Sequence, residues 1–307
     1  MKERICFICN PISGSAIERY FRKTKSMDEK FIDKYLDTDK YEYEVHFTED
    51  EGHATEICAR AIQDGFDIIA AVGGDGTLNE VARLLVDTDI NFAIVPAGSG
   101  NGFSRHVGIP LSLKGALNVI NQHKVQRIDT IGIYPYGSEH TSENRTFFMA
   151  TAGMGFDAEM AYQFKTAKNR GLWTYVKLVF EHFFTYTPKE YEVHLGEEKM
   201  TVEAFAITIA NSSQFGNNAT ISPKAKIDDG LLDVCISRKF PLYALPMLVY
   251  RFFTATIDKS GYIKVHLAER VRVRMESDRM HYDGDSGQIS NDLQFVINKS
   301  SLNVITA

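Results

Sequence analysis

Three short segments rich in glycine and small polar residues are candidates for phosphate chemistry. They are Asn10-Pro11-Ile12-Ser13-Gly14, Gly73-Gly74-Asp75-Gly76-Thr77 and Pro96-Ala97-Gly98-Ser99-Gly100-Asn101. Glycine adopts positive φ angles and lets main-chain N–H groups approach phosphate oxygens closely, because it has no side chain. The hydroxyl groups of Ser13, Thr77 and Ser99 add further donors. These residue types predict a binding site for a bulky anion, whereas any one segment alone is also typical of an ordinary tight turn.

Asp75 is the one carboxylate within these three segments. Its negative charge would repel phosphate unless a cation lay between the two groups. A Mg²⁺ ion held jointly by the carboxylate and phosphate oxygens would satisfy both. The dinucleotide pattern G-x-G-x-x-G is absent from the first strand-to-helix turn, and so is the Walker pattern G-x-x-x-x-G-K-[ST]. The sequence therefore predicts a phosphate site of a different kind.

Each glycine-rich segment follows an apolar run that is expected to form a β-strand. These runs, RICFIC, FDIIAAV and NFAIVP, alternate with amphipathic helical patterns at residues 53–65, 77–86 and 112–123, and YEYEVHFT (41–48) is a further expected strand. Residues 17–40 also have a helical pattern with a charged face. Strands alternating with helices predict a parallel sheet, in which the carboxyl ends of the strands lie along one edge. Ligands bind at that edge in open α/β sheets.

The pattern changes near residue 125, where strand-like runs separated by turn residues begin. This predicts an antiparallel β-sandwich, interrupted by helical segments at residues 173–186 and near 241–256. A length of 307 residues also suits two domains. We expect an α/β nucleotide-binding domain at residues 1–125 and a β-rich domain at residues 126–295.

Composition restricts the partners and the compartment. The net charge of −6 and the absence of a basic block argue against a nucleic-acid partner. Cys6 and Cys9 form a C-x-x-C pattern, but both lie in an expected strand and not at a helix start, so we interpret them as buried small hydrophobes. Few cysteines and no apolar leader favour a cytoplasmic protein. No apolar run approaches the roughly 20 residues of a membrane span.

The segments NPISG, VGGDGTLNEV and PAGSGNGF, in this order, resemble the diacylglycerol, sphingosine and ceramide kinase superfamily. The resemblance continues through GMGFDAEM, RGLWTY, ANSSQFGNNATISPKAKIDDGLLDV and HYDGDSG. GGDGT alone is also similar to NAD kinases, whereas its combination with P-x-G-[ST]-x-N and a late D-G-[ED] is more specific. The resemblance implies an α/β nucleotide domain and a β-rich lipid domain with the active site in the cleft between them. It also implies that the last strand, about residues 296–307, returns to the first domain.

The resemblance implies roles for individual residues. The residues expected around ATP are Asn10, Pro11, Ser13, Gly14, Thr48, Gly73, Gly74, Asp75, Gly76, Thr77, Leu78, Asn79, Glu80, Ser99 and Asn101. Asp285 matches the general base of the family, which is usually Glu, and Asp75 would join the catalytic metal and phosphate network. Two departures are Ser99, where many relatives have Thr, and Gly102, where many bacterial relatives have Asp.

Further matches concern the lipid and a metal. Asp157 corresponds to a position that contacts the lipid head group. Lys226, Asp229 and Leu231 correspond to a structural Mg²⁺ loop. In that loop Asp229 would supply a carboxylate, and Lys226 and Leu231 would supply main-chain carbonyl oxygens. The alternatives are a turn with two exposed carboxylates at residues 283–285, a plain hairpin at 228–230 and a turn carboxylate at 157. The apolar stripe of segment 173–186 fits either a core or a lipid-contacting surface. It consists of Trp173, Val176, Val179, Phe180, Phe183 and Phe184.

These expectations define an ATP- and Mg²⁺-dependent lipid kinase that phosphorylates a hydroxyl of a diacylglycerol or a sphingoid base. The protein would act at the inner face of a membrane without spanning it, and a homodimer is compatible with an open sheet edge. The alternatives are a kinase of the NAD kinase type and a non-catalytic protein that binds lipid or nucleotide.

Overall fold

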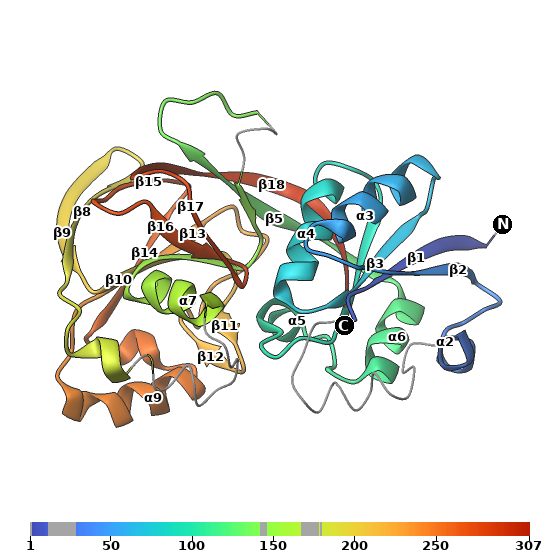
Figure 1. The fold of residues 1–307 in the computed structure, drawn as a ribbon, viewed down its shortest axis with the longest axis horizontal. Helices are drawn as coiled ribbons and strands as arrows, with labels where there is room; N and C mark the ends of the chain where they lie inside the picture. The colour runs from blue at the N-terminus through green and yellow to red at the C-terminus, as the bar shows by residue number, and fades with distance from the viewer. Residues whose placement is uncertain (1, 12–28, 142–145, 167–177, 179) are drawn as a thin grey trace. The chain divides into compact units, whose positions relative to one another are not determined.

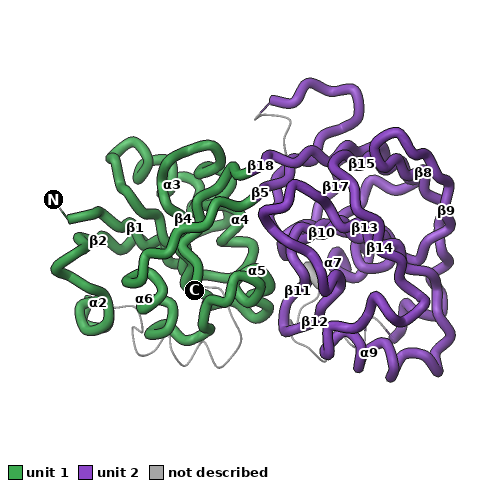
Figure 2. Tube along the Cα trace, turned by 180° about the vertical axis from the view of Figure 1, so that it is seen from behind, with its two compact units in different colours: residues 1–128, 300–307 green, residues 129–299 purple. Residues whose placement is uncertain are grey.

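The computed structural model describes residues 2–11, 29–141, 146–166, 178 and 180–307. The chain divides into two compact units (Figure 2). Unit 1 comprises residues 1–128 and 300–307, and unit 2 comprises residues 129–299. Two long strands, β5 (Lys124–Pro135) and β18 (Asp292–Thr306), contribute residues to both units.

The sheet of unit 1 is parallel, as the alternating strand and helix patterns predict. Its strands are β1 (Glu3–Cys9), β2 (Tyr41–Phe47), β3 (Ile68–Gly73) and β4 (Asn91–Pro96), in the order β2-β1-β3-β4. The end of β18 then pairs with β4 in parallel, with Val304 opposite Phe92. The register places Cys9 opposite Val72 and Gly73 opposite Pro96, so the carboxyl ends of β1, β3 and β4 are level.

Five described helices surround this sheet (Figure 1). They are α2 (Glu29–Tyr35), α3 (His53–Gln63), α4 (Asp75–Leu85), α5 (Gly102–His106) and α6 (Leu113–Gln122). α4 buries Leu78, Val81, Ala82 and Leu85, which is the i, i+3, i+4, i+7 stripe of an amphipathic helix. α4 begins two residues earlier than its apolar pattern indicates, so the Gly73–Thr77 turn already belongs to the helix start.

Unit 2 contains a six-stranded antiparallel sheet in the order β14-β13-β10-β7-β16-β17. Its strands are β7 (Thr151–Gly155), β10 (Ala206–Ala210), β13 (Leu232–Ser237), β14 (Ile263–Ala268), β16 (Arg279–Tyr282) and β17 (Asp285–Gln288). The facing layer follows the order β18-β15-β8-β9, and β5 joins it by pairing with β18 and with β6. Its further strands are β6 (Thr146–Phe148), β8 (Lys189–Leu195), β9 (Glu198–Ala204) and β15 (Arg270–Arg274).

The core of unit 2 lies between these two layers. Met154 and Ile207 come from the six-stranded sheet, and Val193, Val273 and Phe295 come from the facing layer. All five are buried in one hydrophobic cluster. Such a core defines a β-sandwich, which confirms the predicted fold class.

Short elements complete unit 2. They are α7 (Phe156–Thr166), the hairpin β11 (Gln214–Gly216) and β12 (Ala219–Thr220), the 3₁₀ helices η1 (Leu242–Ala244) and η2 (Ile257–Lys259), and α9 (Leu245–Phe253). Residues 173–177 and 179 of the predicted helix at 173–186, which include Trp173, Val176 and Val179, lie outside the described residues. Residues 17–28 of the predicted 17–40 helix also lie outside them. In the part of the chain that the structure describes, no helix has the length and apolar character needed to cross a membrane.

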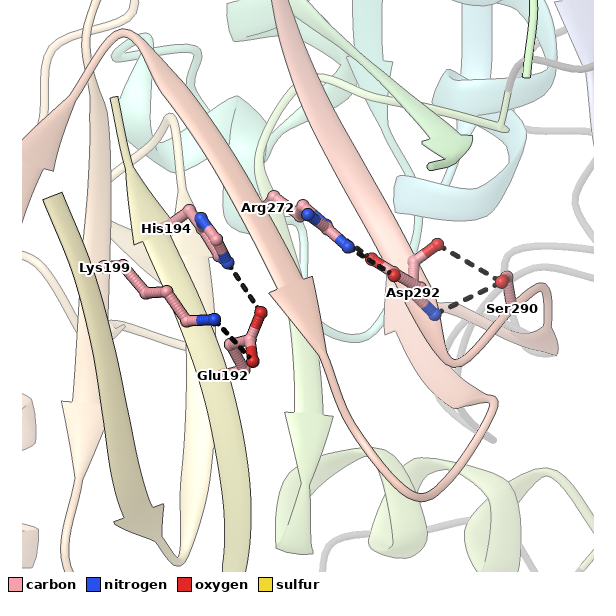
Figure 3. A network of polar contacts seen from close by, with 6 residues as sticks. All are labelled: Glu192, His194, Lys199, Arg272, Ser290 and Asp292. Atoms are coloured by element: carbon pink, nitrogen blue, oxygen red, sulfur yellow. Dashed lines mark hydrogen bonds and ion pairs between the residues drawn. The ribbon is translucent and has the colours of Figure 1, made fainter. Parts of the chain in front are cut away.

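A polar network covers the outer side of the facing layer (Figure 3). Arg272 on β15 forms two parallel hydrogen bonds to the carboxylate of Asp292 on β18, at 2.8 Å and 2.7 Å. On the neighbouring strands, His194 and Lys199 contact the carboxylate of Glu192 at 2.8 Å and 3.0 Å. Hydrogen bonds from these two groups lower the pKa of Glu192 to about 2. The network fixes the register at which β18 enters the sandwich.

The cysteines are free thiols inside the protein. Cys6 and Cys9 lie on β1 and, like Cys58 and Cys235, are buried. Burial raises the pKa of Cys6, Cys9 and Cys58 to about 12. Thiols in this environment are unreactive because the thiolate is the nucleophile, which confirms the interpretation of C-x-x-C as a structural pattern.

Candidate functional site

The level strand ends of unit 1 form a glycine edge, which we define as Asn10, residues 73–77 and residues 97–101. The edge is held by main-chain hydrogen bonds between neighbouring strand ends. The N–H of Asn10 donates to the carbonyl of Val72 at 2.9 Å, and the N–H of Ala97 donates to the carbonyl of Gly73 at 2.8 Å. The described parts of the three segments that the sequence singled out therefore lie side by side.

Two glycines of this edge approach each other through bare backbone. A Cβ atom added at Gly98 would lie 2.3 Å from the Cα of Gly74, and one added at Gly74 would lie 3.1 Å from the Cα of Gly98. Backbone atoms on both sides cannot move aside as a flexible side chain would. Glycine is required at position 98 by this close approach, and the result is a surface of main-chain atoms next to the start of α4.

The start of α4 presents N–H groups without a side-chain cap. Gly74 is the N-cap residue in an extended conformation and contributes no capping side chain. The first N–H groups of a helix have no intrahelical partner, and together with the helix dipole they favour an anion. Thr77 lies in this first turn, where its hydroxyl accepts a hydrogen bond from the Asn10 amide at 3.0 Å.

Asp75 is a buried carboxylate within the glycine edge. Its two oxygens accept hydrogen bonds from the N–H groups of Gly102 at 3.2 Å and Phe103 at 3.3 Å. Burial raises the pKa of the Asp75 carboxyl, and these main-chain hydrogen bonds oppose that shift. Asp75 thus connects the start of α4 to the start of α5 whether or not it also contacts a metal.

The remaining residues predicted to surround ATP occupy different environments. Asn101 adopts a left-handed conformation (φ 48°), and its side chain bonds to both the N–H and the carbonyl of Gly98, at 2.9 Å and 2.6 Å. Ser99 is exposed between them. Thr48 is buried and donates its N–H to the carbonyl of Cys9 at 2.9 Å. The others are the half-buried Pro11 and Glu80 and the buried Leu78 and Asn79; Ser13 and Gly14 lie outside the described residues.

In unit 2, Asp157 belongs to a cluster of three polar side chains, which we name the acceptor cluster: Asp157, Thr208 and His281. Oδ2 of Asp157 accepts a hydrogen bond from the Thr208 hydroxyl at 3.2 Å and lies 3.1 Å from Nε2 of His281. Oδ1 accepts from the N–H of Ala158 at 2.8 Å at the start of α7. The carboxylate is partly exposed, with 21% of its side-chain surface accessible. It therefore has both fixed partners and access to solvent.

Glycine at position 153 makes room for this cluster. A Cβ atom there would lie 2.2 Å from Nε2 of His281 and 2.3 Å from Oδ2 of Asp157. Gly153 is paired with His281 across β7 and β16. Strand pairing therefore brings His281 next to Asp157, although the two residues are 124 positions apart in the sequence.

An ion pair holds α7 on the sheet beside the acceptor cluster. Arg279 on β16 lies 2.7 Å from Glu159 on α7 and also covers the ring of Tyr162 at 4.5 Å. Burial raises the pKa of Glu159, but hydrogen bonds from Gln163 and Arg279 outweigh it and lower the pKa overall. A hollow of about 40 Å³ lined in part by Glu159, Tyr191 and Arg279 lies here. This volume holds about one water molecule and is too small for an acyl chain.

The two carboxylates of the Asp283-Gly284-Asp285 turn differ in environment. Asp283 (φ 43°) and Gly284 (φ 82°) form a two-residue turn between β16 and β17, and positive φ at both positions is typical of a type I′ hairpin. Asp283 is buried, and its oxygens accept hydrogen bonds from the N–H groups of Met149, Ala150 and Thr151 at 2.7, 2.8 and 3.2 Å. The alternative of a turn with two exposed carboxylates is therefore wrong.

Asp285 is the accessible carboxylate of the pair. It is half-buried at the start of β17, and its Oδ1 accepts the N–H of Ser286 at 2.8 Å. It lies opposite Tyr282, whose side chain packs on the sandwich core, while His281 pairs with Ser286. Since paired residues share a face and successive residues alternate, Asp285 and His281 point to opposite faces of the hairpin. The structure thus does not place Asp285 within the acceptor cluster.

The loop predicted to hold Mg²⁺ has two exposed carboxylates, Asp228 and Asp229. Asp229 and Lys226 are exposed, Leu231 is half-buried, and Oδ1 of Asp229 accepts the N–H of Leu231 at 3.1 Å. No group of three or more His, Cys, Asp or Glu side chains suited to a metal is present among the described residues. The three predicted residues would offer a hard cation the Asp229 carboxylate and main-chain carbonyl oxygens.

Asp129 is a buried carboxylate that the sequence analysis did not consider. Its Oδ2 accepts the N–H of Gly230 at 2.7 Å, and its own N–H donates to the carbonyl of Ile227 at 2.6 Å. It anchors the 226–231 loop. Thr208, His281 and Asp283 were not assigned roles either. Of these, only Asp283 had a local signal, since Asp-Gly between two strands is typical of a type I′ turn.

The described aromatic residues of segment 173–186 divide between core and surface. Phe183 is buried and lies in a cluster with Phe156, Met160 and Phe205. Phe180 and Phe184 are 54% and 56% exposed. The segment therefore provides both a core contact and exposed rings.

A parallel α/β unit with a glycine edge, joined to an antiparallel sandwich bearing an acceptor cluster, is the architecture expected of a nucleotide-dependent lipid kinase. Residues 4–133 match the family model of the diacylglycerol kinase catalytic domain. Residues 150–304 match the model of the YegS C-terminal NAD kinase beta sandwich-like domain. The chain belongs to the family that these two models describe.

Individual relatives agree with this placement. A diacylglycerol kinase from Bacillus subtilis is 28% identical over 292 residues, covering 93% of this chain and 90% of the relative. A probable lipid kinase YegS-like from Stenotrophomonas maltophilia is 31% identical over 199 residues, which is 63% of each chain and so less than two thirds of that relative. A crystal structure of a putative diacylglycerol kinase from Bacillus anthracis has the same fold, with a TM-score of 0.74 and 19% identity over 99% of this chain and 97% of that one.

Proposed function

We propose that this protein is an ATP-dependent lipid kinase that transfers the γ-phosphoryl group of ATP to a hydroxyl of a diacylglycerol or a sphingoid base. The observation that carries the proposal is the bare-backbone approach of Gly74 and Gly98 beside the uncapped start of α4. Main-chain N–H groups in this arrangement suit the phosphates of a nucleotide. The family match to diacylglycerol kinases supports the choice of a lipid acceptor.

The nucleotide would be held by the glycine edge. The N–H groups of the first turn of α4 would donate to phosphate oxygens, and the hydroxyls of Ser99 and Thr77 would supplement them. Asn10 and Asn101 hold this surface in shape through their bonds to Thr77 and Gly98. Catalysis of phosphoryl transfer depends chiefly on such positioning and on charge stabilisation.

A Mg²⁺ ion would neutralise charge on the triphosphate when bound. Asp75 would contribute to its environment at the glycine edge, and Asp229 with the carbonyl oxygens of Lys226 and Leu231 would hold a structural ion. Oxygen ligands of these types suit Mg²⁺.

The acceptor cluster would orient the lipid head group. Asp157 can accept a further hydrogen bond from a hydroxyl or an ammonium group, because its carboxylate is partly exposed. Thr208 and His281 fix the direction of that carboxylate. The same geometry serves a glycerol hydroxyl and a sphingoid amine, so it supports the lipid class and leaves both head groups as candidates.

Asp285 would act as the general base. Its carboxylate takes the proton of the acceptor hydroxyl, the oxygen forms a bond to the γ-phosphorus, and the bond to the β,γ-bridging oxygen breaks. The products are ADP, a phosphorylated lipid and the proton on Asp285, which returns to solvent. Asp is one methylene shorter than the Glu of most relatives.

The test is incubation of the purified chain with γ-labelled ATP, Mg²⁺ and a total lipid extract, followed by mass spectrometry of the labelled lipids. We expect label in one lipid class and a loss of at least about a hundredfold in kcat for Asp285→Ala, the scale of a lost general base. Asp285→Glu is the matched control, which should keep activity. Label transfer to NAD in place of lipid would favour the NAD kinase alternative, and ATP-dependent thermal stabilisation without any transfer would favour a binding protein.

A further inference from the structure

Helix α9 exposes an apolar stripe that the fold does not use. Its outward residues, with those of the preceding 3₁₀ turn, form what we name the α9 face: Leu242, Tyr243, Pro246, Val249, Tyr250 and Phe253. These positions follow helical spacing. Tyr243, Tyr250 and Phe253 are 84%, 67% and 58% exposed. Both views place α9 at the end of unit 2 opposite β15 (Figure 1, Figure 2).

The opposite side of α9 already accounts for its attachment to unit 2. Leu248 and Ala244 are buried in a cluster with Ile257 and Ile263, and Met247 and Phe252 pack against that cluster. A surface helix normally has a polar outer side. α9 is instead apolar on both sides, with Arg251 as its single charged residue. The outer stripe therefore has no role in holding the helix to the core.

The segment that contains the α9 face is rich in basic residues, although the whole chain has a net charge of −6. The segment from residue 238 to 264 contains five basic residues and one acidic residue. The basic residues are Arg238, Lys239, Arg251, Lys259 and Lys264. The acidic residue, Asp258, lies 3.9 Å from Lys224, a base outside this segment. Exposed tyrosine and phenylalanine among basic residues are typical of a helix lying in a membrane interface.

We propose that the α9 face rests on an anionic lipid bilayer, with α9 parallel to the membrane plane. Nine residues of helix span about 14 Å, which is too short for the roughly 30 Å hydrocarbon core, so the helix lies in the interface. The inference rests on the proposed function in one respect, because a kinase that phosphorylates lipids must contact the bilayer in which its substrate lies. It assigns the contact to α9, separate from the aromatic segment 173–186.

A second copy of the chain fits the α9 face less well than a bilayer does. A two-fold dimer through this face would bring the same patch of each copy together. This would bring the basic segments of the two copies, residues 238–264, toward each other, and like charges repel. An anionic leaflet complements them instead.

The experiment is flotation of the full chain with vesicles of phosphatidylcholine alone or with about 30% phosphatidylglycerol. The variant Tyr250→Ser/Phe253→Ser removes two exposed rings. Leu111→Ser/Leu267→Ser is the control, since these leucines are 42% and 62% exposed and lie in the loop before α6 and on β14. We expect the first variant to lose at least about tenfold in affinity for the anionic vesicles, given the transfer energy of two aromatic side chains. The control should bind as the wild type does.

Unchanged flotation of the Tyr250→Ser/Phe253→Ser variant would overturn the proposal. A second result would also overturn it. In that result light scattering shows that the wild type is a dimer and the variant a monomer, and neither protein binds vesicles. Phosphorylation of a short-chain lipid dispersed as monomers separates this inference from the proposed function. The variant should retain that turnover and lose turnover on vesicles. If the wild type phosphorylates no lipid yet floats through α9, the proposed function fails and the α9 contact remains.

Discussion

The glycine edge of unit 1 and the acceptor cluster of unit 2 are built in different ways. The edge is made of main-chain atoms, and its geometry depends on side chains being absent at Gly74 and Gly98. The cluster is made of side chains, and its geometry depends on strand pairing that brings Asp157 and His281 together. A site made from backbone requires certain residue types within a short segment. A site made from side chains depends on the order of strands in a sheet.

The largest expected effect comes from adding one methyl group to the backbone-built site. Gly98→Ala places a Cβ 2.3 Å from the Cα of Gly74, so two strand ends must separate. We expect the free energy of unfolding to fall by about 3 kcal/mol, at the upper end for overpacked sites. The thermal stabilisation by ATP should disappear. Calorimetry with and without ATP measures both quantities.

Gly76→Ala is the matched control for this substitution. Gly76 lies in the same turn, yet an added Cβ meets no atom within 4 Å, and its φ is not positive. Alanine favours a helix over glycine by up to about 1 kcal/mol, so the melting temperature should stay or rise. Equal destabilisation by the two substitutions would show that the close approach to Gly74 is not what requires glycine.

A smaller effect is expected where a carboxylate holds main-chain groups in unit 2. Asp283→Asn keeps the shape of the side chain but turns an amide N–H toward the buried donors of Met149, Ala150 and Thr151. We expect a loss of about 2 kcal/mol in unfolding free energy, because a buried donor is left without an acceptor. Urea unfolding followed by circular dichroism measures it.

Asp285→Asn provides the contrast two residues away. Asp285 is half-buried, and its Oδ1 accepts a hydrogen bond from the N–H of the adjacent Ser286. We expect its unfolding free energy to change by less than about 0.5 kcal/mol, as for most surface substitutions, while kinase turnover falls. A large loss of stability for Asp285→Asn, or no loss of stability for Asp283→Asn, would contradict this assignment. The assignment is that Asp283 holds main-chain groups in place and that Asp285 acts in catalysis.

The same contrast explains which features were readable from sequence. The sequence predicted the parallel sheet, the glycine edge and the sandwich. The reason is that the spacing of apolar residues and the positions of glycines are local properties of short segments. The environment of Asp283 was not predicted, because its three donors lie 132 to 134 positions away. Thr208 and His281 share this limitation, since they meet Asp157 only through the pairing of β7 with β10 and β16. Asp129 escaped notice for the same reason.

The last prediction concerns Asp75, a charged side chain within the backbone-built edge. Burial raises its pKa above the usual 3.8, so the folded state prefers the neutral carboxyl. The associated stability is fully present below the unfolded pKa and is lost as the pH rises through the raised folded pKa. Asp75→Asn does not titrate. The unfolding free energy of the variant relative to the wild type should therefore increase as the pH rises from about 4 toward 7, by up to about 1.4 kcal/mol for each unit of pKa shift.

The measurement is urea unfolding of wild type and Asp75→Asn, without nucleotide, at several pH values in this range. Asn has one oxygen for the two N–H groups of Gly102 and Phe103, so the variant starts less stable at low pH. Only the change with pH reports the ionisation. A difference that stays constant, or that moves in the opposite direction, would mean that the two main-chain donors outweigh burial. The edge would then favour a charged Asp75 before any cation arrives.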